Sequence, residues 1–188
     1  MEGDILNVSY HGSDDLFLTG LSYIFHKACC DLDAIIQTDI SASVWVLSEE
    51  AVTLKWIMSL LDKLSDNEPC FIFGTEPYRR IFNNIPNNRH VCFIDASVSI
   101  DDAGMMICAN LIRYALTGYF SDDACRNPLS VGEQEIIRLL LQGLKPKDIA
   151  NKTGLHIKTI SAQKRAAMRK LHVKTTMELL VKYRLARF

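Results

Sequence analysis

A basic face on one helix near the C-terminus is the feature of this sequence that points most directly to a chemical role. Lys158, Ala162, Arg165 and Arg169 fall on the same side of a helix expected from Ile157 to Leu171. Guanidinium and ammonium groups pair with phosphate, and guanidinium groups also donate to base edges in a major groove. The face therefore predicts nucleic-acid binding, and a solvated basic surface is the alternative.

Two short helices must hold that basic helix in place. Ser130-Val-Gly-Glu133 is a capping box that begins the first, which ends at Gly143. The second begins near Pro146 and runs to Thr153, and Gly154 ends it. The basic helix follows after a tight turn, which is the order of a helix-turn-helix. Its opposite face carries the residues expected to enter the core: Ile160, Ala167 and Leu171.

A fourth helix is expected after Thr175, because Thr175-Thr-Met-Glu178 is a second capping box. One stripe of this helix consists of Met177, Leu180, Val181 and Arg184. Three helices already enclose a core, so part of the stripe is expected to be spare and to serve as a dimerisation seam. Ordinary packing against the first helix is the alternative. Residues 129–188 are therefore predicted to form an all-α domain of four helices.

Charge divides the chain into two parts that the net charge of −1 conceals. From Asn127 onward there are 13 Lys and Arg against 4 Asp and Glu, a balance of +9, and the preceding part has 8 against 18, a balance of −10. A basic module joined to an acidic one is typical of a nucleic-acid-binding domain attached to a regulatory domain. We expect domains at 1–120 and 129–188, with the polar segment 121–128 as a linker.

The N-terminal part alternates short apolar runs with amphipathic stretches. The alternation predicts a parallel sheet with helices on both faces, an α/β domain. Helical patterns span 14–27, 51–64 and 105–119. Five strands are expected: Ile5–Tyr10, Ala34–Gln37, Val44–Leu47, Cys70–Phe73 and Val91–Ile94. The last helix is expected to turn one apolar stripe inward: Met105, Cys108, Ala109, Ile112 and Leu116.

Several classes of protein are disfavoured by what the sequence lacks. No CxxC pair occurs among the six cysteines, so buried thiols are expected rather than a metal site or disulfides. No apolar window reaches the ~18 residues of a membrane span, and the acidic Met1–Leu6 does not fit a signal peptide. With no Gly-rich phosphate loop and no nucleophile–base set, we expect a cytoplasmic protein that is not an enzyme and has no cofactor or metal.

The C-terminal residues resemble the LuxR-type (NarL/FixJ) DNA-binding domain. The resemblance rests on Leu129-Ser, Glu133-x-Glu135-Ile-Ile-Arg-Leu-Leu-x-Gln-Gly143, Ile149-Ala150, Lys158-Thr-Ile and Arg169-Lys-Leu171. It implies contacts with bases from Ser161, Ala162 and Arg165. It implies contacts with phosphates from Lys158, Thr159, Gln163, Lys164 and Lys170. Three residues depart from the family pattern: His156 replaces a capping serine, Thr153 a core leucine and Gly132 a charged residue.

The N-terminal part is similar to a response-regulator receiver domain, a fold that carries an Mg²⁺-binding acidic pair, a phosphate-accepting aspartate and a lysine. On this resemblance Gly12 and Ser13 stand at the acidic pair and Ser48 at the acceptor. Near Asp95 no lysine follows the last strand. The resemblance therefore implies a degenerate receiver without phosphate chemistry. A receiver in unusual register, with Asp14, Asp15 and Glu49 as pocket acids, is the alternative.

Together these resemblances imply a bacterial transcription regulator similar to auxiliary regulators of the RcsA type. It would bind double-stranded DNA as a homodimer, or as a heterodimer with another LuxR-type regulator, without phosphorylation. RNA polymerase is a further candidate partner, and no membrane is expected. The alternatives are a phosphorylated response regulator, an acyl-lactone receptor and a module that sequesters another regulator without binding DNA.

Overall fold

The computed structural model describes residues 6–32, 40–47, 68–76, 78–83, 85, 90–120 and 129–186. The chain forms two compact units, an N-terminal α/β unit and a C-terminal helical unit. Three predicted segments lie outside the described residues: the strand Ala34–Gln37, the helix at 51–64 and the linker at 121–128.

The sheet of the N-terminal unit is parallel throughout. Within the described residues it has four strands, against five predicted, in the order β1 (Leu6–His11), β2 (Ile40–Val46), β3 (Cys70–Gly74) and β4 (Val91–Asp95). β2 starts earlier than its predicted bound of Val44. The sequence did not reveal this start, because the serines in the first half of the strand interrupt the apolar run that marks a buried strand. All four correspond to predicted strands.

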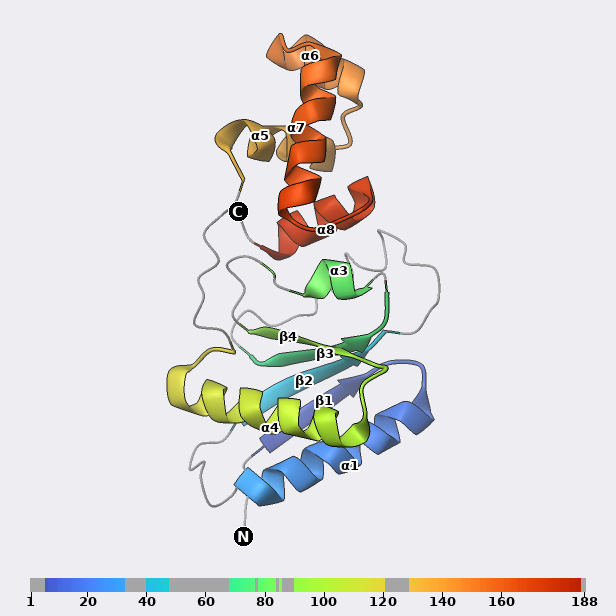
Figure 1. Cartoon of the computed structure of the whole chain (residues 1–188), viewed down its shortest axis with the longest axis vertical. Coiled ribbons are helices and arrows are strands. Elements are labelled where there is room, and N and C mark those ends of the chain that lie inside the picture. The colour runs from blue at the N-terminus through green and yellow to red at the C-terminus, as the bar shows by residue number, and fades with distance from the viewer. Residues whose placement is uncertain are drawn as a thin grey trace. The chain divides into compact units, whose positions relative to one another are not determined.

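Helices cover both faces of this sheet (Figure 1). α1 (Asp15–Leu32) and α4 (Ile100–Thr117) pack against each other on one face, and the short α3 (Tyr78–Phe82) contacts β3 and β4 on the other. The predicted α/β arrangement is thereby confirmed for the described residues. The five residues of α3 are too few to show a helical period, so the sequence did not reveal it.

The two long helices begin at capping side chains. Asp14 Oδ1 accepts a hydrogen bond from the Phe17 N–H (2.9 Å), and Ser99 Oγ accepts one from the Asp102 N–H (3.1 Å). These bonds satisfy backbone donors that the first turn leaves unpaired. The cap at Ser99 also explains why α4 begins five residues before the predicted start at Met105.

The predicted inward stripe of α4 is right for Cys108 and Ile112, which pack against the core, and wrong for its other members. Met105 is 64% exposed and Leu116 is 78% exposed, whereas Ala103, Ile107 and Leu111 are buried. Both sets have helical spacing, so periodicity alone does not choose between them. Contact with the sheet selects the buried face of α4. Ile107 and Leu111 pack in one core with aromatic side chains from α1 and β3: Phe25, Phe71 and Phe73.

The thiols in the sheet have low reactivity, because they are protonated near neutral pH. Burial raises the pKa of both Cys70 and Cys92 to about 12, so neither thiolate forms readily near neutral pH. Cys30 is exposed. Among the described helices, none is both long and apolar enough to cross a bilayer.

We expect Ile107→Ala to lower the free energy of unfolding of this unit by about 2–5 kcal/mol, since it leaves a cavity in the core. Met105→Ala on the same helix should change it by less than about 0.5 kcal/mol. Urea unfolding followed by tryptophan fluorescence measures this unit, because Trp45 and Trp56 both belong to the N-terminal part of the sequence. Equal losses for the two variants would contradict the face assigned to α4.

Candidate nucleic-acid interface

The described part of the C-terminal unit contains four helices: α5 (Val131–Leu141), α6 (Pro146–Thr153), α7 (Ile157–Lys170) and α8 (Thr176–Leu185). The predicted four-helix organisation is therefore present. Two small cores hold the helices together. Ile149 of α6 and Ile160 of α7 pack with α5 in one, and Ala167, Leu179 and Tyr183 share the other.

The start of α5 is joined to the end of α7 through one buried carboxylate. Glu133 Oε2 accepts hydrogen bonds from the Ser130 N–H and from Lys170 Nζ, both at 2.7 Å. Ser130 Oγ in turn accepts from the Glu133 N–H at 3.3 Å, which completes the predicted capping box. Burial disfavours ionisation of Glu133, but the hydrogen bonds from Lys170 and Ser130 outweigh it, so the pKa of Glu133 is lowered.

The turn between α6 and α7 is built by three residues. Gly154 has φ of 72°, a left-handed conformation that favours glycine, and its N–H bonds the Ala150 carbonyl. Thr153 Oγ1 donates to the Ile149 carbonyl at 2.8 Å, so this departure from the family pattern serves the helix end. His156 Nδ1 then accepts from the Lys158 N–H at 3.1 Å and caps α7 in place of the usual serine.

The two predicted faces of α7 are confirmed. Ile160, Ala167 and the following Leu171 are buried in the domain core. The opposite side is open to solvent and carries the residues of the predicted basic face: Lys158, Ala162, Arg165 and Arg169. Ser161 is half-buried at the border of this face. We call these exposed residues together with Ser161 the basic face of α7.

The residues expected along phosphates divide into two groups. Lys158 and Thr159 are exposed at the first turn of α7. The others contact the domain itself: Lys164 Nζ donates to Thr176 Oγ1 at 3.2 Å, and Lys170 binds Glu133. Gln163 lies over α5, since a Cβ at Gly132 would be 3.1 Å from its Nε2. A side chain at position 132 would therefore require the end of Gln163 to move slightly.

The expected dimerisation stripe on α8 is unevenly exposed. Leu179 and Tyr183 turn toward the core, which leaves the stripe on a neighbouring face of the helix. Arg184 is exposed, Met177 and Leu180 are half-buried, and Val181 is buried. The capping box predicted at the start of α8 is confirmed. Glu178 Oε2 accepts from the Thr175 N–H, and Thr175 Oγ1 accepts from the Glu178 N–H.

In the N-terminal unit the positions matched to receiver chemistry have other surroundings. A Cβ at Gly12 would lie 3.1 Å from Val46 Cβ, so an acidic side chain there would require the strand to shift. Asp14 is engaged as the cap of α1. Asp95 binds the Ser97 N–H and Oγ at 3.0 and 2.6 Å, which lowers its pKa. Ser48 and Glu49 lie outside the described residues.

Known proteins resemble both units. Residues 127–183 match the family described as bacterial regulatory proteins, luxR family. The transcriptional regulatory protein RcsB of Escherichia coli and that of Salmonella typhimurium are each 46% identical over 52 residues, which are 28% of this chain and 24% of the relative. The match thus spans about a quarter of the length of these relatives. A solved structure of two RcsB dimers bound to two parallel DNAs has a TM-score of 0.52 at 18% identity, covering 97% of this chain and 98% of that chain.

The C-terminal unit is therefore a LuxR-family helix-turn-helix domain, as the sequence resemblance predicted. The N-terminal unit has a receiver-like fold that precedes it in the same order as in RcsB. At 18% identity the likeness to RcsB concerns the fold alone.

His156→Ala should weaken the N-terminus of α7 by about 1 kcal/mol, because the Lys158 N–H loses its acceptor. His156→Ser restores an acceptor of the kind that helix starts favour and should keep the stability. Amide hydrogen exchange at Lys158 and Thr159 measures the effect locally. Equal exchange in the alanine variant and the natural protein would show that the imidazole does not cap the helix.

The lowered pKa of Glu133 predicts a pH dependence of stability. Its contribution should be complete above the ordinary value of 4.5 and should be lost as the pH falls through the lower folded-state value. In Glu133→Gln the contribution is absent, so the stability gap to the natural protein should be constant above that pH and should narrow below it. Unfolding followed by circular dichroism at several pH values measures the gap. Glu135→Gln, at an exposed site on the same helix, is the control and should follow the natural profile.

Proposed function

We propose that this protein is a DNA-binding transcription regulator whose C-terminal unit reads double-stranded DNA with the basic face of α7. The observation that carries the proposal is the division of α7, which buries Ile160 and Ala167 and presents Lys158 and Arg165 to solvent. The LuxR-family match supports it. So does the structure of RcsB bound to DNA, at the level of the fold.

In this proposal the contacts divide by side-chain chemistry. Arg165 donates to a base edge, with Ser161 and Ala162 allowing the helix to enter the groove. Lys158 and Thr159 contact phosphates, helped by the N-terminal end of α7. Lys164 and Lys170 join the phosphate contacts at the cost of their present partners, so their individual effects on affinity are smaller. Gln163 joins them from its place beside Gly132.

We further propose that the regulator acts as a dimer, either with a second copy or with another LuxR-type chain. Two such helices then meet half-sites about one helical turn apart. The exposed and half-buried members of the α8 stripe supply the seam: Met177, Leu180 and Arg184, with Val181 beneath them. The RcsB dimers in the related structure support this arrangement. Such a protein works in the cytoplasm, where RNA polymerase is a candidate further partner.

Phosphorylation is not needed in this proposal. Gly12 stands at an acidic position and is closely packed against Val46. Ser48, at the position of the acceptor, offers no carboxylate. The receiver-like unit is then a surface for dimerisation or for a partner.

Selection from a random pool of duplex DNA by the full chain tests the proposal. We expect an enriched two-fold motif. Arg165→Ala should relax selectivity at one base pair by about 1–3 kcal/mol. Lys158→Ala should instead weaken binding evenly across sequences and reduce the salt slope by about 1, because one phosphate contact is lost.

Lys27→Ala provides the matched control, since it removes the same charge from an exposed position on α1. It should leave both affinity and selectivity unchanged. Equal losses on all sequences for Arg165→Ala and Lys158→Ala would contradict the division of roles. Absence of salt-dependent DNA binding, together with a tight complex with another LuxR-type chain, would favour the sequestering module instead.

A further inference from the structure

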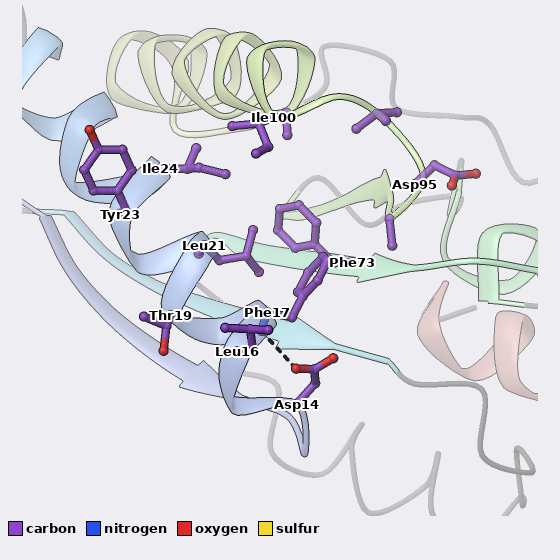
Figure 2. Close-up of a pocket in the computed structure, with 14 residues that line it drawn as sticks. Asp14, Leu16, Phe17, Thr19, Leu21, Tyr23, Ile24, Phe73, Asp95 and Ile100 are labelled. Carbon is purple, nitrogen blue, oxygen red and sulfur yellow. Dashed lines mark hydrogen bonds between the residues drawn. The ribbon is translucent and has the colours of Figure 1, made fainter.

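A cavity with a volume of about 680 Å³ lies between α1 and α4 of the receiver-like unit. Figure 2 shows the apolar side chains that surround it: Phe17, Leu21 and Ile24 from α1, Phe73 from β3 and Ile100 from α4. Phe73 is buried, whereas Ile100 is 72% exposed, so the cavity reaches from the core to the surface. Small-molecule sites have volumes of roughly 300–1,000 Å³ and walls of this kind.

Among the described residues, the two charged side chains that line this cavity are both acidic. Asp14 precedes α1 and Asp95 ends β4, so both belong to the edge of the sheet where the strands end (Figure 2). The hydrogen bonds from Ser97 keep the pKa of Asp95 low, and its carboxylate is therefore ionised near neutral pH. Arg79 offsets it weakly, because its Nη1 is 3.7 Å away and its side chain is 57% exposed. One end of the cavity is thus negative and the rest apolar.

Gly20 offers a position at which the cavity can be filled without disturbing the packing of α1. A glycine inside a helix costs roughly 0.5–1 kcal/mol relative to alanine. Gly20 lies inside α1 and lines the cavity, yet a Cβ added there would meet nothing within 4 Å. Packing therefore does not require glycine at this position. A larger residue would instead reach into the cavity and reduce its volume.

We propose that this cavity binds a small organic amine with an apolar body. The ammonium group lies near Asp14 and Asp95, and the hydrocarbon part lies against Phe17 and Phe73. The acidic end selects against an anionic ligand of the same shape. The degenerate receiver would then have a ligand site next to the edge where a working receiver carries its phosphate. This assignment concerns the receiver-like unit and does not depend on DNA binding by the other unit.

The test uses two probes with the same apolar body and opposite charges, phenylbutylamine and phenylbutyrate. Calorimetry on the full chain should show that the amine binds about tenfold or more tightly than the acid. Combined Asp14→Asn and Asp95→Asn substitutions should abolish that preference. Asparagine retains the acceptor oxygens that bind the Phe17 and Ser97 N–H groups, so the local fold is preserved.

Gly20→Leu should remove binding of both probes by filling the cavity. His26→Leu is its matched control, since it adds the same side chain at an exposed position of α1 that does not line the cavity, and it should bind as the natural protein does. Absence of binding, equal affinity for the two probes, or amine binding that survives Gly20→Leu would each overturn the proposal. A second copy of this chain is the competing occupant of the cavity, and sedimentation of the same samples measures whether the chain self-associates. Self-association that Gly20→Leu abolishes, without preference between the probes, would assign this face to a second copy and equally overturn it.

Discussion

The C-terminal unit depends on one buried carboxylate. A buried charge is costly unless hydrogen bonds and an opposite charge satisfy it, and Glu133 has both, from the Ser130 N–H and Lys170 Nζ. The pair joins the start of α5 to the end of α7. A domain of about 60 residues has little apolar area with which to orient its helices. The ion pair fixes the C-terminal end of α7, and Ile160 fixes its N-terminal half. The direction of the basic face follows from these two constraints.

The same constraint explains why a basic residue on α7 is not automatically available to a ligand. Charge counting treats Lys158 and Lys170 alike, but the ammonium group of Lys170 already has a partner and that of Lys158 is exposed. A phosphate that binds Lys170 must compete with a buried carboxylate. In the unbound protein the usable positive charge of α7 is therefore concentrated on Lys158, Arg165 and Arg169. The first of these residues, Lys158, lies in the first turn of α7, where the helix backbone also favours anions.

Local chemistry made most of this unit predictable. Capping boxes, turn glycines and helical spacing act over a few residues, and the bounds of α5 to α8 follow from them. The Lys170–Glu133 pair spans 37 positions, and no local signal marks it. The same limit explains the error in α4, where two apolar stripes of equal spacing compete and only contact with the sheet selects Ile107 over Met105. The resemblance placed His156 at the capping position of α7, but imidazole is uncommon there, and only the structure shows that its Nδ1 accepts from the Lys158 N–H.

The receiver-like unit has a parallel α/β fold with Gly12 at a position where the receiver resemblance places an acid. A receiver needs carboxylates where β1 ends, because Mg²⁺ prefers oxygen ligands. Gly12 permits close contact between this strand end and Val46, and restoring an acid there would disturb β2 itself. The remaining acids then take structural or electrostatic roles, Asp14 as a cap and Asp95 in a turn with Ser97. Negative charge from Asp14 and Asp95 thus lies at the carboxyl edge of the sheet. An organic cation satisfies the same field with fewer geometric demands than Mg²⁺, and the adjoining apolar cavity favours a ligand that carries hydrocarbon as well as charge.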